Sequence, residues 1–414
     1  MNRQRAMWIV FAVALVVRLG VATLVLPGLK TDTNPDYYRE LGRNVLAGKG
    51  FVAVAPDGRE LPNVNRPLAY PVFLAGVMAV GGDRLGVIAV ANCLLAAVGC
   101  ALVVWWASRW LTPGAALAAG LIVALEPNTI LRCAVPMVEP LFTLWVVMGA
   151  GLLTWHRDKS WGWAGAGVCW GLAALTRVVA IWLWPVALVV VLATQVSWQR
   201  RAVWFAVFVL GFGSLVGMWM ARNATVTGYW IFSTSGRYYM VSNWAASLEA
   251  RRAGEPVEAA QKKIWARTGS TEFCAGREEL ERMWRKQEAV LREVRDAAPL
   301  WLAVHSARGA GETLLGPGRR ALETMSREPG KGRQRWAWWY STGLAGLLAL
   351  AAWGAMRRWR ELWLVAVLAG YFVVFTVGPI GNSRFRYPMV PMLAILAVAG
   401  LSRVKEESCS KTSS

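Results

Sequence analysis

The chain has 414 residues, of which 56% are hydrophobic and only 17% are charged, and it contains 25 tryptophans. Apolar runs of this number and length exceed what one or two soluble cores can bury, and several approach the roughly 20 residues needed to cross a hydrocarbon core of about 30 Å. The composition therefore excludes a soluble protein and predicts an all-α integral membrane protein. The net charge of +20 does not indicate nucleic-acid binding, because much of it lies in short loops, where lysine and arginine set membrane orientation.

The apolar runs predict about ten membrane spans. In chain order these are residues 7–26, 84–106, 113–131, 134–154, 161–176, 178–194, 202–220, 337–356, 361–380 and 387–403. The first run is too long for a cleavable signal peptide, and no small-residue cleavage site follows it. Segment 67–81 is apolar but short and contains Pro71, so we interpret it as an interfacial or re-entrant helix.

Basic residues decide the predicted orientation. If 67–81 does not span, the basic loops between spans and both basic termini fall on one face, which the positive-inside rule identifies as the cytoplasm. The outer face then holds a first loop, 27–83, and a long segment, 221–336. The expected organisation is an N-terminal membrane module, an outer helical segment, C-terminal membrane helices and a polar tail, at residues 1–220, 221–336, 337–404 and 405–414.

The first outer loop contains TDTNPDYYRELGRNVLAGKGF, residues 31–51. Asn34 is a favourable N-cap and Pro35 suits the first helical position, so we expect a short helix to begin there and to end at the glycines of LAGKGF. Asp36 falls in the first turn, where the macrodipole favours its ionised form by roughly 0.3–1 kcal/mol. Acids also decorate helix starts without a further role, so position alone leaves the function of Asp36 open.

The outer segment 221–336 is basic with interleaved glutamate. In REELERMWRKQEAVLREVRD, the residues Leu280, Met283, Trp284, Leu291 and Val294 recur at helical spacing, which predicts an amphipathic helix packed on the membrane domain. The few cysteines and two histidines show no metal-ligand spacing, and no nucleotide-binding glycine loop is present. We therefore expect neither a histidine- or cysteine-based zinc site nor ATP as an energy source.

Ionisable residues from separated parts of the chain converge on the predicted outer face. Arg66 precedes a proline-rich entry in NRPLAYP, and Glu139 stands at the outer end of the fourth span in VPMVEPLFTLW. Arg177 ends GLAALTR, while Arg384 and Arg386 lie in NSRFRYPMVPML before the last span. Such residues are costly at a membrane surface unless they are paired or functional. Any one arginine is more commonly an interfacial anchor, but together they indicate a site.

The order of these motifs resembles the GT-C type polytopic glycosyltransferases, specifically the bacterial relatives of protein O-mannosyltransferases and lipid A aminoarabinose transferases. Those families carry an acid in the first outer loop, a nearby tyrosine, a glycine-terminated helix and a proline-rich entry, matched here by Asp36, Tyr37, LAGKGF and RPLAYP. Glu139, GLAALTR, an Arg-Asn pair and RYPMVP match later motifs. The resemblance runs over most of 5–402 and is weakest in 240–335. Two departures are the absence of a second acid after Asp36 and a glutamate at 139 where relatives often carry aspartate.

The resemblance implies a GT-C-like fold and transfer of a sugar from a polyprenyl-phosphate donor to an acceptor hydroxyl or amine at the outer face. It implies that Asp36 is the catalytic base with support from Glu139. Donor-phosphate candidates are Arg66, Arg177, Arg384 and Arg386, and cavity candidates are Tyr37, Tyr70 and Tyr387. The implied partners are the donor lipid, the membrane and a glycan, lipid or protein acceptor, without nucleic acid. Some members use a divalent metal and others do not, so a metal stays an open alternative.

A membrane transporter or flippase of a lipid-linked or anionic substrate is the alternative function. Ten spans with arginines at the surface also suit an anionic lipid, but the chain shows no inverted repeat, and its acids lie at span ends rather than at the midplane. A non-catalytic assembly subunit would explain the basic outer segment but not the ordered motifs. The resemblance to bacterial members implies location in the bacterial inner membrane, and the distribution of basic residues predicts that both termini are cytoplasmic.

Overall fold

The computed structural model describes residues 1–28, 37–55, 58–269, 272–274, 276–296, 299–318, 332–376, 378 and 380–402. Asp32, Asp36, the expected helix start at Asn34 and Pro35, and the polar tail 405–414 lie outside the described residues. The described chain is almost entirely helical, which confirms the predicted all-α class, and one pair of short strands is the exception within it.

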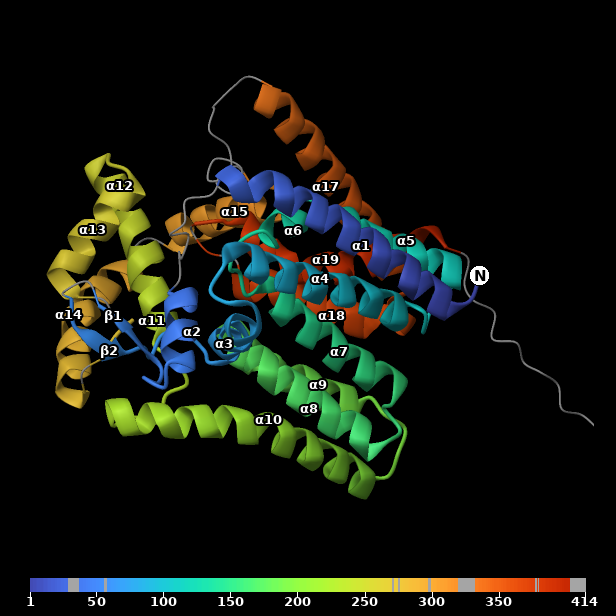
Figure 1. Cartoon of the computed structure of the whole chain (residues 1–414), viewed down its shortest axis with the longest axis horizontal. Coiled ribbons are helices and arrows are strands. Elements are labelled where there is room, and N and C mark those ends of the chain that lie inside the picture. Colours follow the sequence, from blue (N-terminus) through green and yellow to red (C-terminus); the bar gives the residue numbers. More distant parts are fainter. Residues whose placement is uncertain are drawn as a thin grey trace, which may run out of the picture.

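The apolar helices pack into one elongated bundle (Figure 1). Helix α1 packs along α4, α4 along α7, α7 along α8, and α8 along α10, while α17 packs along α19. Each bundle helix overlaps one predicted span. Their bounds are α1 Arg3–Val25, α4 Leu85–Ala107, α5 Pro113–Leu125, α7 Glu139–Trp155, α8 Ser160–Thr176, α9 Trp184–Leu192, α10 Trp198–Thr227, α17 Gly332–Arg357, α18 Trp359–Thr376 and α19 Val390–Leu401.

The lengths of the helices support a multi-pass membrane protein. Within the described part of the chain, four helical stretches are long and apolar enough to cross a bilayer: Arg3–Val25, Leu85–Ala107, Trp198–Thr227 and Ser383–Leu401. Other apolar helices are shorter; α5 has 13 residues and is therefore about 20 Å long. The number of ten spans and the side on which each terminus lies stay predictions.

The third predicted span is broken in two. Pro127 starts the short helix α6 (Pro127–Arg132), and the side chain of Glu126 caps its first turn. Proline has no N–H to continue α5, so the last carbonyl groups of α5 lack helical donors. The guanidinium of Arg18, which is 1% exposed, donates to the carbonyl oxygen of Ala124 at 2.8 Å. The buried charge in the first span thus satisfies the broken helix.

The first loop folds into helix α2 (Tyr38–Leu46), a hairpin of β1 (Val52–Val54) and β2 (Glu60–Pro62), and helix α3 (Ala69–Gly81). The described helix α2 begins at Tyr38, because Tyr37 has a φ of 60°, a left-handed conformation that a continuous helix cannot contain. Gly48, with a φ of 73°, ends α2 as predicted. The hairpin is not predicted, since its strands have only three residues each.

Segment 67–81 is a short helix that packs along α2. A Cβ added at Gly42 would lie 3.2 Å from the carbonyl oxygen of Pro71, so glycine lets the two helices approach closely and a larger residue would require a shift of a few tenths of an ångström. Beyond the end of α3, the carboxylate of Asp83 accepts hydrogen bonds from Arg39, at 2.6 Å, and from Arg43. These contacts hold α2 against α3; the depth of α3 in the membrane stays a prediction.

A cluster of helices at one end of the bundle, called the outer module below, lies beside the hairpin (Figure 1). It consists of α11 (Ser235–Tyr239), the π-helical turn η3 (Met240–Ala245), α12 (Ala246–Ala253), α13 (Val257–Thr268) and α14 (Arg277–Arg295). The predicted amphipathic helix is α14, whose Leu280, Leu291 and Val294 are buried. Leu291 and Val294 pack against Ile264 of α13 in one apolar cluster.

The bundle ends that face the outer module are irregular. The 3₁₀ turn η2 (Val178–Leu183) precedes α9, and the 3₁₀ turn η4 (Ser383–Met389) precedes α19. Pro388 lies inside η4, where it disfavours regular α-helix. Two further elements complete the described chain, the turn η1 (Leu26–Gly28) after α1 and helix α15 (Pro299–Leu315), which packs against η4. The turns η2 and η4 bring arginines to the junction between bundle and outer module.

Candidate functional site

A cavity of about 1040 Å³ lies where the first loop, the outer module and the bundle ends at η2, α18 and η4 meet. This volume is at the upper end of the range of small-molecule sites, about 300–1,000 Å³. The charged residues of the described chain that line it are Arg59, Arg66, Arg177, Arg384, Glu272 and Glu279. Aromatic side chains from all three parts form much of the remaining wall. A basic and aromatic lining suits an anionic ligand with apolar parts.

Arg177 and Arg384 are held on one buried carboxylate. Glu139 begins α7 and is 0% exposed, and its Oε1 accepts hydrogen bonds from Nη1 of Arg177, at 3.4 Å, and from Nε of Arg384. Arg177 follows the last residue of α8, and Arg384 lies in η4. The structure therefore brings together three predicted residues from separated parts of the sequence. Both arginines line the cavity, and Glu139 lies behind them.

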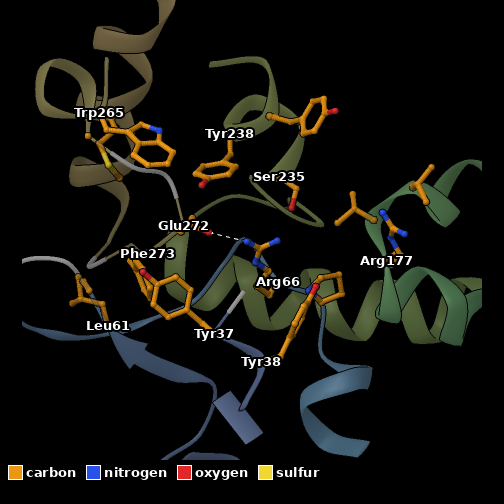
Figure 2. Close-up of a pocket in the computed structure, with 18 of the residues that line it drawn as sticks. Tyr37, Tyr38, Leu61, Arg66, Arg177, Ser235, Tyr238, Trp265, Glu272 and Phe273 are labelled. Atoms are coloured by element: carbon orange, nitrogen blue, oxygen red, sulfur yellow. Dashed lines mark hydrogen bonds and ion pairs between the residues drawn. The ribbon is translucent and has the colours of Figure 1, made fainter. Parts of the chain in front are cut away.

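Arg66 lines the cavity from the first loop and pairs with an acid that lies between α13 and α14. Its Nη2 lies 3.1 Å from Oε1 of Glu272, and its guanidinium lies 5.7 Å from the centre of the Tyr38 ring. Figure 2 shows the guanidinium pointing toward Glu272. The sequence analysis did not identify Glu272, because it lies in a short extended segment with no motif of its own.

Aromatic side chains cover the cavity on the side of the outer module. The rings of Tyr238 and Trp265 stack with centres 5.9 Å apart, and the ring of Tyr37 meets that of Phe273 edge-on at 5.3 Å (Figure 2). Burial and the neighbouring carboxylate of Glu272 raise the pKa of Tyr37 above its usual value. Its hydroxyl therefore stays protonated at neutral pH and can donate a hydrogen bond to a ligand.

Two of the predicted cavity tyrosines lie elsewhere. The hydroxyl of Tyr70 is 3.3 Å from Oδ1 of Asn92, and that of Tyr387 is 3.9 Å from Sγ of Cys133. Both side chains are buried in the helical bundle and neither lines the cavity. Their position supports a packing role, and of the three predicted tyrosines only Tyr37 reaches the cavity.

Arg386 also lies outside the cavity, although Arg384 lines it. Its Nη1 donates to the carbonyl oxygens of Thr313, at 2.7 Å, and of Leu314, at 3.1 Å, and the residue is 0% exposed. Its Nη2 lies 3.8 Å from Oε1 of Glu126. These contacts satisfy the last carbonyl groups of α15. The geometry therefore assigns Arg386 to the helix end and not to a ligand.

The predicted base, Asp36, lies outside the described residues. It directly precedes Tyr37 in the sequence, and the side chain of Tyr37 lines the cavity. For metals, the described residues contain no group of three or more histidine, cysteine, aspartate or glutamate side chains that could hold an ion. The described residues can thus bind an anion through arginine, donate hydrogen bonds from tyrosine and pack aromatic rings against a ligand.

Sequence comparisons match part of the chain to membrane sugar transferases. Residues 65–219 match the family model of dolichyl-phosphate-mannose-protein mannosyltransferase. An undecaprenyl phosphate-alpha-4-amino-4-deoxy-L-arabinose arabinosyl transferase of Pseudomonas aeruginosa (strain LESB58) is 28% identical over 212 residues, which cover 47% of this chain and 37% of that relative. The undecaprenyl phosphate-alpha-4-amino-4-deoxy-L-arabinose arabinosyl transferase 2 of Pseudomonas fluorescens is 26% identical over 171 residues, which cover 40% of this chain and 28% of that protein. The matched part thus spans about a third of these curated relatives.

Solved structures extend the similarity to nearly the whole chain. The archaeal oligosaccharyltransferase AglB from Archaeoglobus fulgidus, in complex with an inhibitory peptide and a dolichol-phosphate, superposes with a TM-score of 0.54 at 14% identity. The superposition covers 95% of this chain and 50% of that one, which shows a common fold. The chain is therefore a polytopic membrane protein with the fold of the GT-C type glycosyltransferases, and it resembles the mannosyltransferases and aminoarabinose transferases of that type.

Proposed function

We propose that the chain transfers a sugar from a polyprenyl-phosphate-linked donor to an acceptor hydroxyl or amine at the outer face of the bacterial inner membrane. The observation that carries the proposal is the convergence of Arg66, Arg177 and Arg384 on one cavity at the end of the bundle. Guanidinium groups present forked N–H donors that match phosphate oxygens. The match of residues 65–219 to a family that uses a lipid-phosphate sugar supports this class of ligand over other anionic lipids.

The apolar side of the cavity suits the lipid part of such a donor. Val178, Val179 and Trp182 of η2 and Phe375 of α18 line the cavity beside the arginines, and Trp182 is 53% exposed. A polyprenyl chain lying in the bilayer against these side chains would bring its phosphate to the guanidinium groups. Tyr238 and Trp265 then lie on the opposite side of the cavity, where flat apolar rings suit the C–H face of a sugar.

The transfer step places charge on the donor phosphate. The acceptor oxygen or nitrogen bonds to the anomeric carbon, the bond from that carbon to the phosphate oxygen breaks, and the lipid phosphate leaves with one more negative charge. Arginine donors held in place before the reaction stabilise that developing charge without reorganisation. The buried carboxylate of Glu139 supplies this fixed arrangement, since Arg177 and Arg384 share it.

Asp36 is the proposed base that takes the proton of the acceptor. It lies one residue before Tyr37, which lines the cavity. The two acids of the described residues that line the cavity are both ion-paired, Glu272 with Arg66 and Glu279 with Arg59. A carboxylate engaged by a guanidinium is a weaker proton acceptor, which argues against Glu272 and Glu279 for this role.

The proposed topology places both termini in the cytoplasm and the cavity outside. Its support is the distribution of arginine and lysine among short loops. A donor lipid that is assembled or flipped to the outer leaflet then reaches the cavity from the bilayer. Residues 27–83 and 221–336 face the same compartment in this arrangement, and a cavity lined by residues of both segments supports it.

The proposal is tested with purified protein in lipid nanodiscs. Undecaprenyl phosphate bearing radiolabelled mannose or 4-amino-4-deoxy-arabinose is incubated with the protein and with extracted envelope lipids and glycans as acceptors. We expect label to leave the polyprenyl lipid and to appear in an acceptor fraction, and we expect the double variant Arg177→Gln, Arg384→Gln to lose this transfer. Lys286→Gln, on the exposed face of α14, is the matched control for charge. Proteoliposomes that move the intact labelled lipid between leaflets without transfer would identify a flippase instead.

A further inference from the structure

Glu272 is a second carboxylate held against the arginines of the cavity. Its Oε1 lies 3.1 Å from Nη2 of Arg66 and accepts a hydrogen bond from Nδ2 of Asn65 at 3.0 Å. The side chain of Glu272 is 10% exposed and that of Arg66 is 20% exposed, so water screens the pair only in part. Figure 2 shows the two side chains meeting within the cavity.

The backbone fixes Glu272 in this position. The amide of Val64 donates to the carbonyl oxygen of Glu272 at 3.1 Å, and the amide of Cys274 donates to that of Pro62 at 3.2 Å. Between them, residue 273 forms a β-bridge with residue 63. Backbone contacts therefore join the segment that carries Glu272 to the first loop, and they hold the carboxylate of Glu272 beside Arg66.

Among the described residues, the six charged side chains of the cavity lining and Glu139 behind them sum to one positive charge, and Arg132, which interacts electrostatically with Glu139 and Arg384, adds a second. Arg177 and Arg384 share the carboxylate of Glu139, and Arg66 is paired with Glu272. The other two charged residues of the described cavity lining also form an ion pair, with Nη2 of Arg59 3.2 Å from Oε1 of Glu279. A lipid phosphodiester carries one negative charge, whereas a lipid phosphate monoester carries about 1.5 to 2 at neutral pH.

We propose that Glu272 is a positioning residue that makes the site favour the donor over the lipid product. It holds Arg66 at the phosphate and also places a negative charge beside that phosphate. This charge repels the more highly charged monoester product more strongly than it repels the diester donor, and it therefore promotes release of the product. The inference rests on the proposed function, in which a polyprenyl phosphodiester is converted to a polyprenyl phosphate.

Two lipid probes that differ in charge test this inference. Undecaprenyl phosphate is the monoester, and its monomethyl ester is a diester without a sugar. Glu272→Gln keeps an oxygen that can accept from Asn65 and removes the charge. At about 6 Å and an effective dielectric constant of 20, removal of one unit charge should tighten diester binding by about 100-fold. Binding of the monoester should tighten by a further factor of about 10 to 100, because it carries about 0.5 to 1 more negative charge.

Two matched variants separate charge from structure. Glu272→Asp keeps the charge and should leave the ratio of the two dissociation constants within about twofold of wild type. Glu279→Gln removes the other ion-paired acid of the cavity, whose side chain is more exposed, at 25%, so its charge is better screened and the ratio should change less than in Glu272→Gln. In turnover with a labelled donor, Glu272→Gln should lower kcat and KM together, since slow product release limits both.

The outcomes distinguish the inference from the function on which it rests. Wild-type protein that binds neither lipid contradicts the proposed function and the inference with it. Binding of both lipids with the same ratio in wild type and Glu272→Gln contradicts the role of Glu272 alone. An equal change of the ratio in Glu279→Gln would also overturn it, because the effect would then belong to the cavity as a whole.

Discussion

Replacing Glu139 with glutamine removes the charge shared by Arg177 and Arg384 and keeps the shape of the side chain. A pair of unit charges about 4 Å apart interacts by roughly 4 kcal/mol at an effective dielectric constant of 20. Glu139 is 0% exposed, so solvent does not replace the lost carboxylate. Removal of one partner of a buried pair costs about 3–5 kcal/mol. We expect a loss near the lower figure, because the amide oxygen still accepts one hydrogen bond.

The assay is a double-mutant cycle on stability in detergent micelles. Wild type, Glu139→Gln, Arg384→Gln and the double variant are unfolded by denaturant and followed by tryptophan fluorescence. The double variant should lose less than the sum of the single losses, with a coupling of about 1–3 kcal/mol, because it leaves fewer charges unpaired. Turnover in Glu139→Gln should fall by about 10²-fold, since guanidinium groups displaced by an ångström no longer meet the phosphate.

Two results would refute this reasoning. Losses that add to within about 0.5 kcal/mol would show that Glu139 and Arg384 are not coupled. The control is Glu249→Gln, which removes the partner of Arg267 on the surface of the outer module, where the two side chains are 30% and 55% exposed. It should cost less than about 1 kcal/mol, because exposed pairs contribute little. A loss in the control as large as that in Glu139→Gln would remove burial as the cause.

Four further outcomes are expected. Asp36→Asn should lower turnover by about 10²–10⁴-fold with lipid-phosphate binding intact, whereas full activity in Asp36→Asn and its loss in Asp32→Asn would assign the base to the other acid. Arg66→Ala should weaken binding of undecaprenyl phosphate about tenfold, with partial recovery in Arg66→Lys; equal affinities would make Arg66 an anchor. Burial raises the pKa of Asp83, but hydrogen bonds from two arginines of α2 outweigh this effect, so the pKa lies below its ordinary value. The stabilisation by Asp83 is therefore present above pH about 3.9 and is lost as the pH falls. Asp83→Asn should melt at a lower temperature than wild type at pH 7 and at the same temperature as wild type at low pH. Lys262→Cys in a cysteine-free chain should react with an impermeant maleimide from the outer side, and reaction from the cytoplasmic side alone would reverse the topology.

Periodicity in the sequence was sufficient to predict much of the fold. The apolar runs mark the bundle helices, and the buried Leu280 and Leu291 of α14 follow from spacing alone. The break at Pro127 has a local signal, since proline cannot continue a helix, yet the run 113–131 reads as one apolar span. The hairpin of the first loop has no such signal, because strands of three residues are too short to show alternation.

The site illustrates what sequence patterns cannot resolve. Arg384 and Arg386 are two residues apart in a 3₁₀ turn, where successive residues rotate by about 120°, so their side chains point in different directions. One lines the cavity and the other binds the end of α15, and this choice depends on the packing of η4. The sequence also gives no sign that Glu272 belongs to the site, because its ion pair with Arg66 joins two segments that are far apart in the chain.

The proposed function requires that the cavity bind the phosphate of a polyprenyl lipid. An experimental structure of the protein in nanodiscs with undecaprenyl phosphate tests it most directly. We expect phosphate oxygens about 2.7–2.9 Å from guanidinium nitrogens of at least two of Arg66, Arg177 and Arg384, with the lipid chain leaving past η2. Lipid phosphate bound elsewhere, with these arginines still paired with Glu139 and Glu272, would contradict it.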